Sequence, residues 1–280
     1  MSLIWIPFIT LTILFFGIGQ VFTKIGTTRL GSPGMLLLLS LNMFIIYGVT
    51  WLIFNEDAPI GTIPFLYTIL ATILSATGYI FFYEAVERQR ISIVGVVTAA
   101  YPLITVILAV LFLSEILTLA QILAIAFITI SVSILSHTSQ ESETNNRTWL
   151  LFAVLCLIIW GIWAAAAKFA ISMVGHITYT GVYAAVGPSI FIPYWYVRSG
   201  KFHLTRKDFN AELSVIFFCC GGLSFYAALY YGLASIVSAF SNLYPFVTIV
   251  LARIMLSERL ERHHKIAVVL ALSGIVLSTL

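Results

Sequence analysis

Long apolar runs separated by short polar stretches follow one another along the whole chain. A helix that crosses a membrane needs about 20 mostly apolar residues. The pattern therefore predicts an all-α membrane protein. Cutting the runs at charges, prolines, glycines and polar clusters gives ten predicted transmembrane helices at 3–24, 34–54, 62–86, 92–113, 119–137, 149–172, 177–197, 211–231, 233–256 and 264–280.

Composition supports this interpretation. Hydrophobic residues make up 61% of the chain and charged residues only 9%, whereas soluble domains have roughly 45–50% apolar and about 25% charged residues. Lipid must therefore surround most of the chain, and the bilayer is its first expected partner. The net charge of +3 is too small and too dispersed to indicate a nucleic acid partner.

The chain repeats itself. Shifting it by 143 residues places 83–124 on 226–267 with fifteen identities and no gap. Tyr101-Pro102 falls on Tyr244-Pro245 in this register, and a Leu-Ser-Glu triplet recurs as well. Chance does not readily place such polar residues in register, so we infer a duplication. The predicted organisation is a first five-helix repeat over 1–138, a polar linker over 139–147 and a second five-helix repeat over 148–280.

Five helices per half is an odd number, so the second half should enter the membrane from the opposite side. Inverted repeats of this kind are typical of secondary transporters, which bind substrate near the bilayer midplane where the repeats meet. The expected fold is therefore ten transmembrane helices arranged as two inverted repeats.

Segments 82–117 and 225–260 carry a more specific signal. Each has a helix end rich in Tyr and Ala, a Ser-Ile-Val start, a Tyr-Pro within the next helix and a closing Ser-Glu. In this the chain resembles the EamA-like branch of the drug/metabolite transporter superfamily, over nearly its whole length. The first half departs from the family pattern at Glu84, Glu87, Arg88 and Arg90. The resemblance implies a ten-helix transporter whose fourth and ninth helices line a central cavity.

Pro102 and Pro245 each stand about ten residues into a predicted helix. Proline there removes a backbone hydrogen bond and kinks the helix, at a cost of about 3 kcal/mol in water. The kinks either improve packing or shape the cavity and let these helices bend as gates. The resemblance favours gates.

Polar and aromatic side chains on the expected cavity helices are the candidates for substrate binding. A side-chain amide inside a membrane helix must find a partner, either a neighbouring helix or a polar substrate. Rings with a polar group suit aromatic or cationic ligands, although Trp and Tyr also collect at membrane interfaces. The candidate residues are Gln20, Tyr79, Tyr83, Tyr101, Trp160, Trp163, Tyr226, Asn242 and Tyr244.

Charged groups are scarce inside the predicted helices. Glu84 is the nearest to an intramembrane carboxylate, and its basic neighbours are expected to keep it ionised. Without a central carboxylate to carry protons, we expect a facilitator rather than a proton-driven pump. Enzyme motifs and Cys/His metal sets are absent from the sequence, so we predict no catalytic residues, no metal site and no cofactor.

The sequence thus predicts a secondary transporter, exporter or facilitator, of a small metabolite. A neutral or zwitterionic substrate such as an amino acid is the first expectation, and an aromatic or cationic drug-like compound is the alternative. A membrane enzyme or scaffold is the alternative of another class. We expect a monomer in the cell (inner) membrane. The Lys and Arg bias of the connections places the termini outside, whereas the family resemblance implies termini inside, and both remain open.

Overall fold

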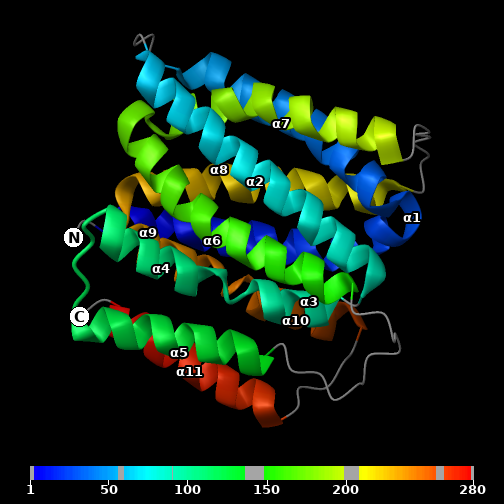
Figure 1. Ribbon diagram of the computed structural model, residues 1–280. Helices are drawn as coiled ribbons and strands as arrows, with labels where there is room; N and C mark the ends of the chain where they lie inside the picture. The colour runs from blue at the N-terminus through cyan, green and yellow to red at the C-terminus, as the bar shows by residue number, and fades with distance from the viewer. Residues whose placement is uncertain are drawn as a thin grey trace.

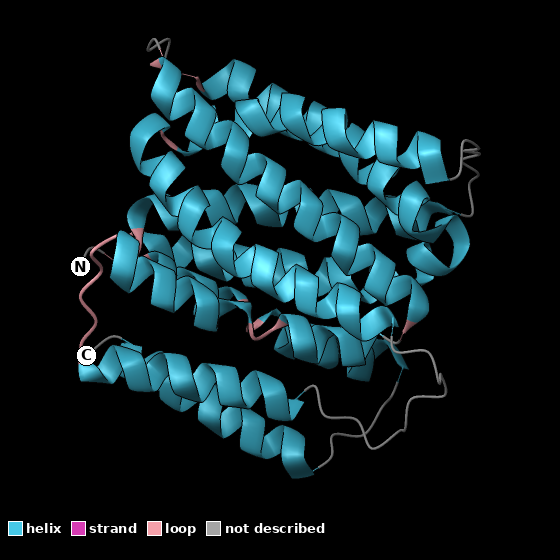
Figure 2. Ribbon diagram, viewed as in Figure 1, coloured by secondary structure: helices cyan, strands magenta, loops and turns pink. Residues whose placement is uncertain are grey.

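The structure is a computed structural model that describes residues 3–55, 60–89, 91–135, 148–198, 208–256 and 262–278. The predicted linker lies outside these residues. Within them the chain forms helices and short connections and no β-strand (Figure 2). The helices are α1 Trp5–Phe54, α2 Thr62–Arg88, α3 Ile91–Thr98, α4 Tyr101–Phe112, α5 Leu119–Leu135, α6 Thr148–Val174, α7 His176–Arg198, α8 Phe209–Tyr231, α9 Ala234–Ser241, α10 Tyr244–Leu256 and α11 Arg262–Ser278.

Five described segments are long and apolar enough to cross a membrane, and shorter apolar helices accompany them. Large apolar side chains are exposed along the outside of these helices, for example Phe44 at 62% and Leu52 at 74%. Water would disfavour such a surface, because exposed apolar area costs about 25 cal/mol per Å². A lipid surrounding removes this cost, and the prediction of an all-α membrane protein is confirmed.

The first two predicted helices form one interrupted helix, α1, without a loop between them. Gly31 adopts a left-handed conformation (φ 67°), and Pro33 follows inside the helix. Glycine enters this region without steric cost, and proline suits the first turn of the segment that restarts. Glu87 Oε2 accepts a bond from the backbone N–H of Ser32 at 2.8 Å, so a carboxylate caps the new start. The first helix therefore runs past the predicted end at residue 24.

The predicted fourth and ninth helices are each broken in two rather than kinked. α3 ends at Thr98 and α4 begins at Tyr101, while α9 ends at Ser241 and α10 begins at Tyr244. Pro102 and Pro245 thus stand in the first turn of a new helix. A first-turn N–H has no intrahelical partner in any case, so the expected cost of about 3 kcal/mol does not arise.

The helices pack into a layered bundle (Figure 1). α1 packs on α7 and α8, and α2 packs on α6. α5 and α11 pair with each other and lie together along one edge of the bundle (Figure 1). The chain enters α1 and leaves α11 at the same end of the bundle, as Figure 1 shows.

Some contacts between the two halves are reciprocal. Thr248 Oγ1 donates to the carbonyl of Gly17 at 3.0 Å, and its repeat equivalent Thr105 donates to the carbonyl of Gly161 at 3.1 Å. The rings follow the same rule, since Tyr101 packs edge-on to Trp160 and Tyr244 packs edge-on to Phe16. Pairs in which each side repeats the other's contact are the mark of a two-fold relation.

Candidate functional site

A small cavity lies where the broken helices meet the other long helices of both halves. It measures about 50 Å³, enough for a few water molecules at roughly 10–15 Å³ each. Typical small-molecule sites hold roughly 300–1,000 Å³, so this conformation is contracted around its centre. The lining residues are Phe16, Gln20, Tyr79, Phe82, Thr98, Tyr101, Trp160, Trp163, Phe218, Phe225, Ser241, Asn242 and Tyr244.

Aromatic rings make most of this wall, and no lining side chain is charged. The predicted residues Gln20, Tyr79, Tyr101, Trp160, Trp163, Asn242 and Tyr244 all belong to it. Sequence reasoning missed Thr98, Ser241 and the four phenylalanines. The chain has 21 phenylalanines, and nothing in the sequence separates those of the cavity from those that face lipid.

Gln20 supplies a free polar atom to the cavity. The residue is only 7% exposed. Its carbonyl oxygen Oε1 is buried and has no hydrogen-bond partner within the described residues. A buried polar atom left unpaired costs about 1–3 kcal/mol. Such an atom on a cavity wall is able to accept a bond from a bound molecule.

Asn242 joins the two helix breaks to each other. At the first break the N–H of Leu103 bonds the carbonyl of Ala100 rather than that of Ala99. Asn242 Nδ2 donates to the carbonyl of Ala99, which is the repeat equivalent of Asn242 itself. The amide therefore lines the cavity and also bridges the halves, which are the two roles that the sequence left open.

A second bond crosses the same junction. The hydroxyls of Tyr101 and Ser241 lie 2.7 Å apart, and Tyr101 Oη also lies 3.4 Å from the carbonyl of Ser238. α4 of the first half is thereby tied to α9 of the second half. Tyr244, the equivalent of Tyr101, lines the cavity without such a bond to its hydroxyl among the described residues.

Trp160 forms the aromatic centre of one cavity wall. Its ring stacks on Phe82 at 5.3 Å between centroids and meets Tyr79 edge-on at 5.5 Å. Gly78 leaves the space for the indole, because a Cβ there would lie 2.3 Å from Trp160 Cδ1. The equivalent Gly221 makes room for Phe16 in the same way.

Two predicted candidates lie behind the wall rather than on it. Tyr83 is fully buried, and its hydroxyl finds no partner in the described part of the chain. Tyr226 packs among other tyrosines, with ring centroids 4.9 Å from Tyr179 and 6.1 Å from Tyr47. Both residues shape the core around the cavity, and a direct role in substrate binding stays a prediction for them.

Glu115 is a polar anchor that the sequence did not single out. It is 7% exposed, and its carboxylate accepts bonds from the backbone N–H groups of Ala234 at 2.6 Å and Ser235 at 3.2 Å, and from the Ser235 hydroxyl. Beside it, Lys168 Nζ donates to the carbonyls of Leu229 at 2.6 Å and Gly232 at 2.8 Å. An anion thus caps the start of α9 and a cation caps the end of α8, as the helix dipoles favour.

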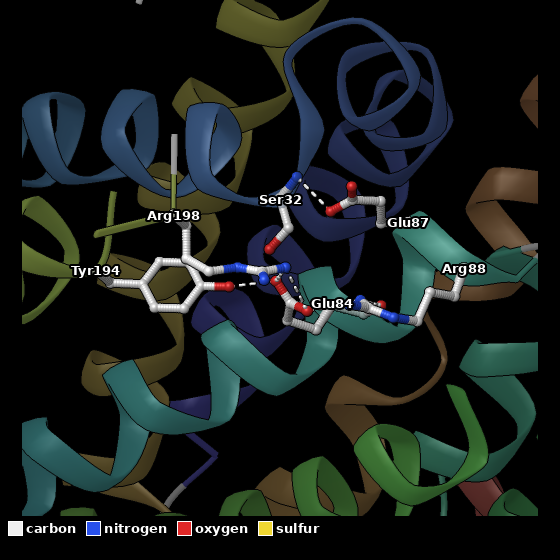
Figure 3. A network of polar contacts seen from close by, with 6 residues as sticks. All are labelled: Ser32, Glu84, Glu87, Arg88, Tyr194 and Arg198. Atoms are coloured by element: carbon white, nitrogen blue, oxygen red, sulfur yellow. Dashed lines mark hydrogen bonds and ion pairs between the residues drawn. The ribbon is translucent and has the colours of Figure 1, made fainter. Parts of the chain in front are cut away.

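Glu84 belongs to a network that joins the C-terminal ends of α2 and α7 (Figure 3). It is 4% exposed and pairs with Arg88 at 2.6 Å and Arg198 at 3.3 Å. The hydroxyl of Tyr194 donates to the same carboxylate. The expected pairing of Glu84 with its own helix thus extends to α7 of the second half. Glu84 is not among the cavity-lining residues.

Replacing Glu84 by glutamine is expected to lower the free energy of unfolding by about 1–3 kcal/mol, because two guanidinium groups then lose their shared counter-charge. Both arginines are partly exposed, which limits the loss. Thermal unfolding in detergent measures the effect. The double variant Glu84→Gln/Arg198→Gln should recover part of the loss, and a single variant as stable as the parent would contradict this account.

The site holds no apparent metal ligands. Within the described ranges, no three His, Cys, Asp or Glu side chains are grouped so that they could bind a metal ion. The arrangement offers aromatic surface, neutral hydrogen-bonding groups and a boundary between two repeats. Such a site is able to bind and release a small molecule.

Comparisons with known proteins agree with this arrangement. The sequence profile of the EamA-like transporter family matches residues 3–137 and again residues 147–280. An uncharacterised protein of Methanocaldococcus jannaschii is 39% identical over 70 residues, which are 25% of this chain and 51% of that protein. The chain thus spans about half the length of this curated relative.

A solved crystal structure has the same fold. It is similar with a TM-score of 0.74 and 14% sequence identity, over 96% of each chain. At this identity the likeness concerns the fold alone. The two family matches together cover almost the whole sequence and confirm the resemblance that the repeated motifs indicated. The chain therefore belongs to the EamA-like transporter family and is a multi-pass membrane protein built from two repeats.

Proposed function

We propose that the protein is a secondary transporter that carries a small neutral or zwitterionic metabolite, such as an amino acid, by alternating access. The observation that carries the proposal is the uncharged, aromatic cavity enclosed between two halves whose contacts are reciprocal. Transporters of this kind bind substrate at the repeat interface, and one half moves against the other around that site.

Ten crossings follow if α1 is counted as two spans, and if α3 with α4 and α9 with α10 are counted as one span each. Each half, residues 1–138 and 148–280, then has five spans, and the two halves have opposite orientations in the membrane. The reciprocal contacts support a two-fold axis between them. An axis in the membrane plane gives two equivalent arrangements, one open to each side.

The chemistry of the wall supports the substrate class. No carboxylate lines the cavity to pair with a cation, and burying an unpaired ion there would be costly. A zwitterion can use the ends of the broken helices, because α4 and α10 begin at the cavity and α3 and α9 end there. The aromatic rings favour a second candidate, an uncharged compound with a flat ring.

Energy coupling is proposed to be passive. Glu84 is held by two arginines away from the cavity wall. Of the other buried carboxylates among the described residues, Glu115 accepts hydrogen bonds from the start of α9 and Asp208 pairs with Arg29. A substrate gradient then drives the exchange between states. We place the transporter in the cell membrane as a monomer.

A thermal-shift panel of amino acids, nucleosides, sugars and cationic drugs tests the substrate class with the purified protein. Binding stabilises the folded protein by about 2.7 kcal/mol when the ligand is at 100 times its Kd. Compounds that raise the melting temperature then enter flux assays in proteoliposomes, with and without an imposed pH gradient. Uphill accumulation driven by that gradient, and abolished by Glu84→Gln, would contradict the passive proposal.

Gln20→Leu should affect binding and stability in opposite directions. The substitution removes the unpaired oxygen, so the melting temperature should rise or stay unchanged. If a substrate group donates to this oxygen, its apparent affinity should fall about fivefold. Thr12→Val is the matched control, since Thr12 lies on the same helix, bonds only the carbonyl of Phe8 among the described residues and is outside the wall. A Gln20→Leu variant with unchanged affinity for every transported compound would contradict the role of this residue.

A further inference from the structure

The two half-helices that meet at the cavity differ in their surroundings, although they are repeat equivalents. All eight residues of α9, Ala234–Ser241, are buried. In α3, Ile91, Gly95 and Val97 are only half-buried. α9 packs against α4 of the other half, whereas the described residues of α3 and α10, the equivalent pair, make fewer contacts with each other.

One position illustrates this difference. Ser238 on α9 is 0% exposed. Its equivalent on α3 is Gly95, where an added Cβ would meet no atom within 4 Å. Among the described side chains, the bundle is therefore closed between α4 and α9 and more open at Gly95 on the side of α3 and α10. A strict two-fold arrangement would make the two sides alike.

Hydrogen bonds between the halves show the same asymmetry. Tyr101 bonds Ser241 at 2.7 Å. The equivalent pair is Tyr244 and Thr98, which carries the same two functional groups. Thr98 Oγ1 donates within its own helix, to the carbonyl of Val94 at 3.1 Å, and no bond joins it to the Tyr244 hydroxyl in the described part of the chain. Tyr244 and Thr98 therefore carry the hydroxyl groups for a second bond between the halves, but they do not form it in this conformation.

Other equivalent contacts are made on both sides. The bonds of Thr105 to Gly161 and of Thr248 to Gly17 differ by only 0.1 Å, from 3.1 to 3.0 Å. Contacts that obey the two-fold relation are able to persist when the halves exchange conformations. A contact that breaks it can be exchanged for its two-fold equivalent where the equivalent residues carry the same functional groups.

We propose that Tyr101–Ser241 and Tyr244–Thr98 are alternating latches of the transport cycle. The structure holds the first latch and is closed between α4 and α9. In the opposite-facing state the first latch opens, the second forms, and α3 packs against α10. The inference rests on the alternating access proposed above and adds the residues that distinguish its two states.

The experiment uses one reporter cysteine at a time in the full-length, detergent-solubilised protein. The background replaces Cys156, Cys219 and Cys220 by alanine, and the reporters are Gly95→Cys and Ser238→Cys. N-ethylmaleimide labelling is followed by mass spectrometry. Ser238→Cys reacts only from the opposite state, so it should label at least about tenfold more slowly than Gly95→Cys, given a minor state of roughly 0.1–10%.

Phe variants of the two tyrosines should then shift the equilibrium between the two states in opposite directions. Tyr101→Phe removes the latch of the state seen in the structure and should raise the labelling rate of Ser238→Cys. We expect about fivefold, because one neutral hydrogen bond changes the equilibrium between the states by about that factor. Tyr244→Phe removes the latch of the opposite state and should lower the same rate about fivefold. Equal responses to the two substitutions, or no response to either, would overturn the proposal.

Hydrogen exchange provides a second measurement if a reporter variant does not fold. In the chain with its native cysteines, exchange of the α9 amides should rise in Tyr101→Phe and fall in Tyr244→Phe, and the reverse order or no change would overturn the latches. Neither measurement needs a substrate. If the two Phe variants shift labelling or amide exchange of α9 in opposite directions but no substrate flux is found, the latches stand and the carrier is refuted. If flux is found but both variants shift these rates in the same direction, the carrier stands and the latches are refuted.

Discussion

Replacing Glu115 by alanine is expected to lower the free energy of unfolding by about 2–4 kcal/mol. The carboxylate accepts three hydrogen bonds at the start of α9, and bonds to a charged group contribute about 1.5–3 kcal/mol each, less when they share one site. Every residue of α9 is buried, so water cannot readily take over the freed N–H groups. Unfolding in detergent, followed by circular dichroism against temperature, measures the loss.

Glu87→Ala is the matched control for this prediction. Glu87 also caps a helix start, through the single bond from Ser32 at 2.8 Å, but its side chain is exposed. Water can replace that bond, so we expect a loss below about 1 kcal/mol. Losses of equal size in the two variants would contradict the capping role given to Glu115.

Adding a single methyl group at Gly161 or Gly17 is expected to lower the free energy of unfolding by about 1–3 kcal/mol and to reduce transport. A Cβ on Gly161 would lie 2.5 Å from Ile104 Cβ, and one on Gly17 would lie 2.5 Å from Val247 Cβ. Each position also carries the carbonyl that accepts a bond from the other half. The halves would have to separate, and both contacts would be lost.

Gly48→Ala, on the same helix α1 as Gly17, provides the comparison. The nearest atom to a Cβ at Gly48 is Ala184 Cβ at 4.0 Å, an ordinary contact. Alanine also favours the helix by about 1 kcal/mol relative to glycine. This variant should therefore be as stable as the parent or more stable. A loss at Gly48 equal to that at Gly161 would contradict the role given to the contact between the halves.

The repeat carried most of what the sequence could predict. Its register pairs Tyr101 with Tyr244 and points to the two broken helices, and seven of the nine candidates line the cavity. The register of the repeat cannot show that equivalent helices, such as α3 and α9, pack differently in one conformation. Tyr83 and Tyr226 were grouped with the wall because helices that are apolar on all sides give no periodicity to separate a cavity face from a buried face.

Glu115 was missed for a different reason. The Ser-Glu pair is visible in both repeats, but the partners of Glu115 at the start of α9 lie 119 and 120 residues further along the chain. The turn that aims it depends on Ser114, a non-glycine residue with a positive φ of 55°. Residues other than glycine, Asn and Asp rarely adopt a positive φ, so no sequence pattern predicts the turn.

Exchange transport tests the central claim most directly. Proteoliposomes are preloaded with an unlabelled compound that the thermal-shift panel identifies, and uptake of the same compound in labelled form is followed from outside. In a carrier, the unlabelled compound inside competes with the labelled compound for the site and slows its exit, so labelled compound should accumulate transiently above its equilibrium level and then decline. Uptake that rises steadily to equilibrium, with the same time course in preloaded and empty vesicles, would contradict alternating access and indicate a channel.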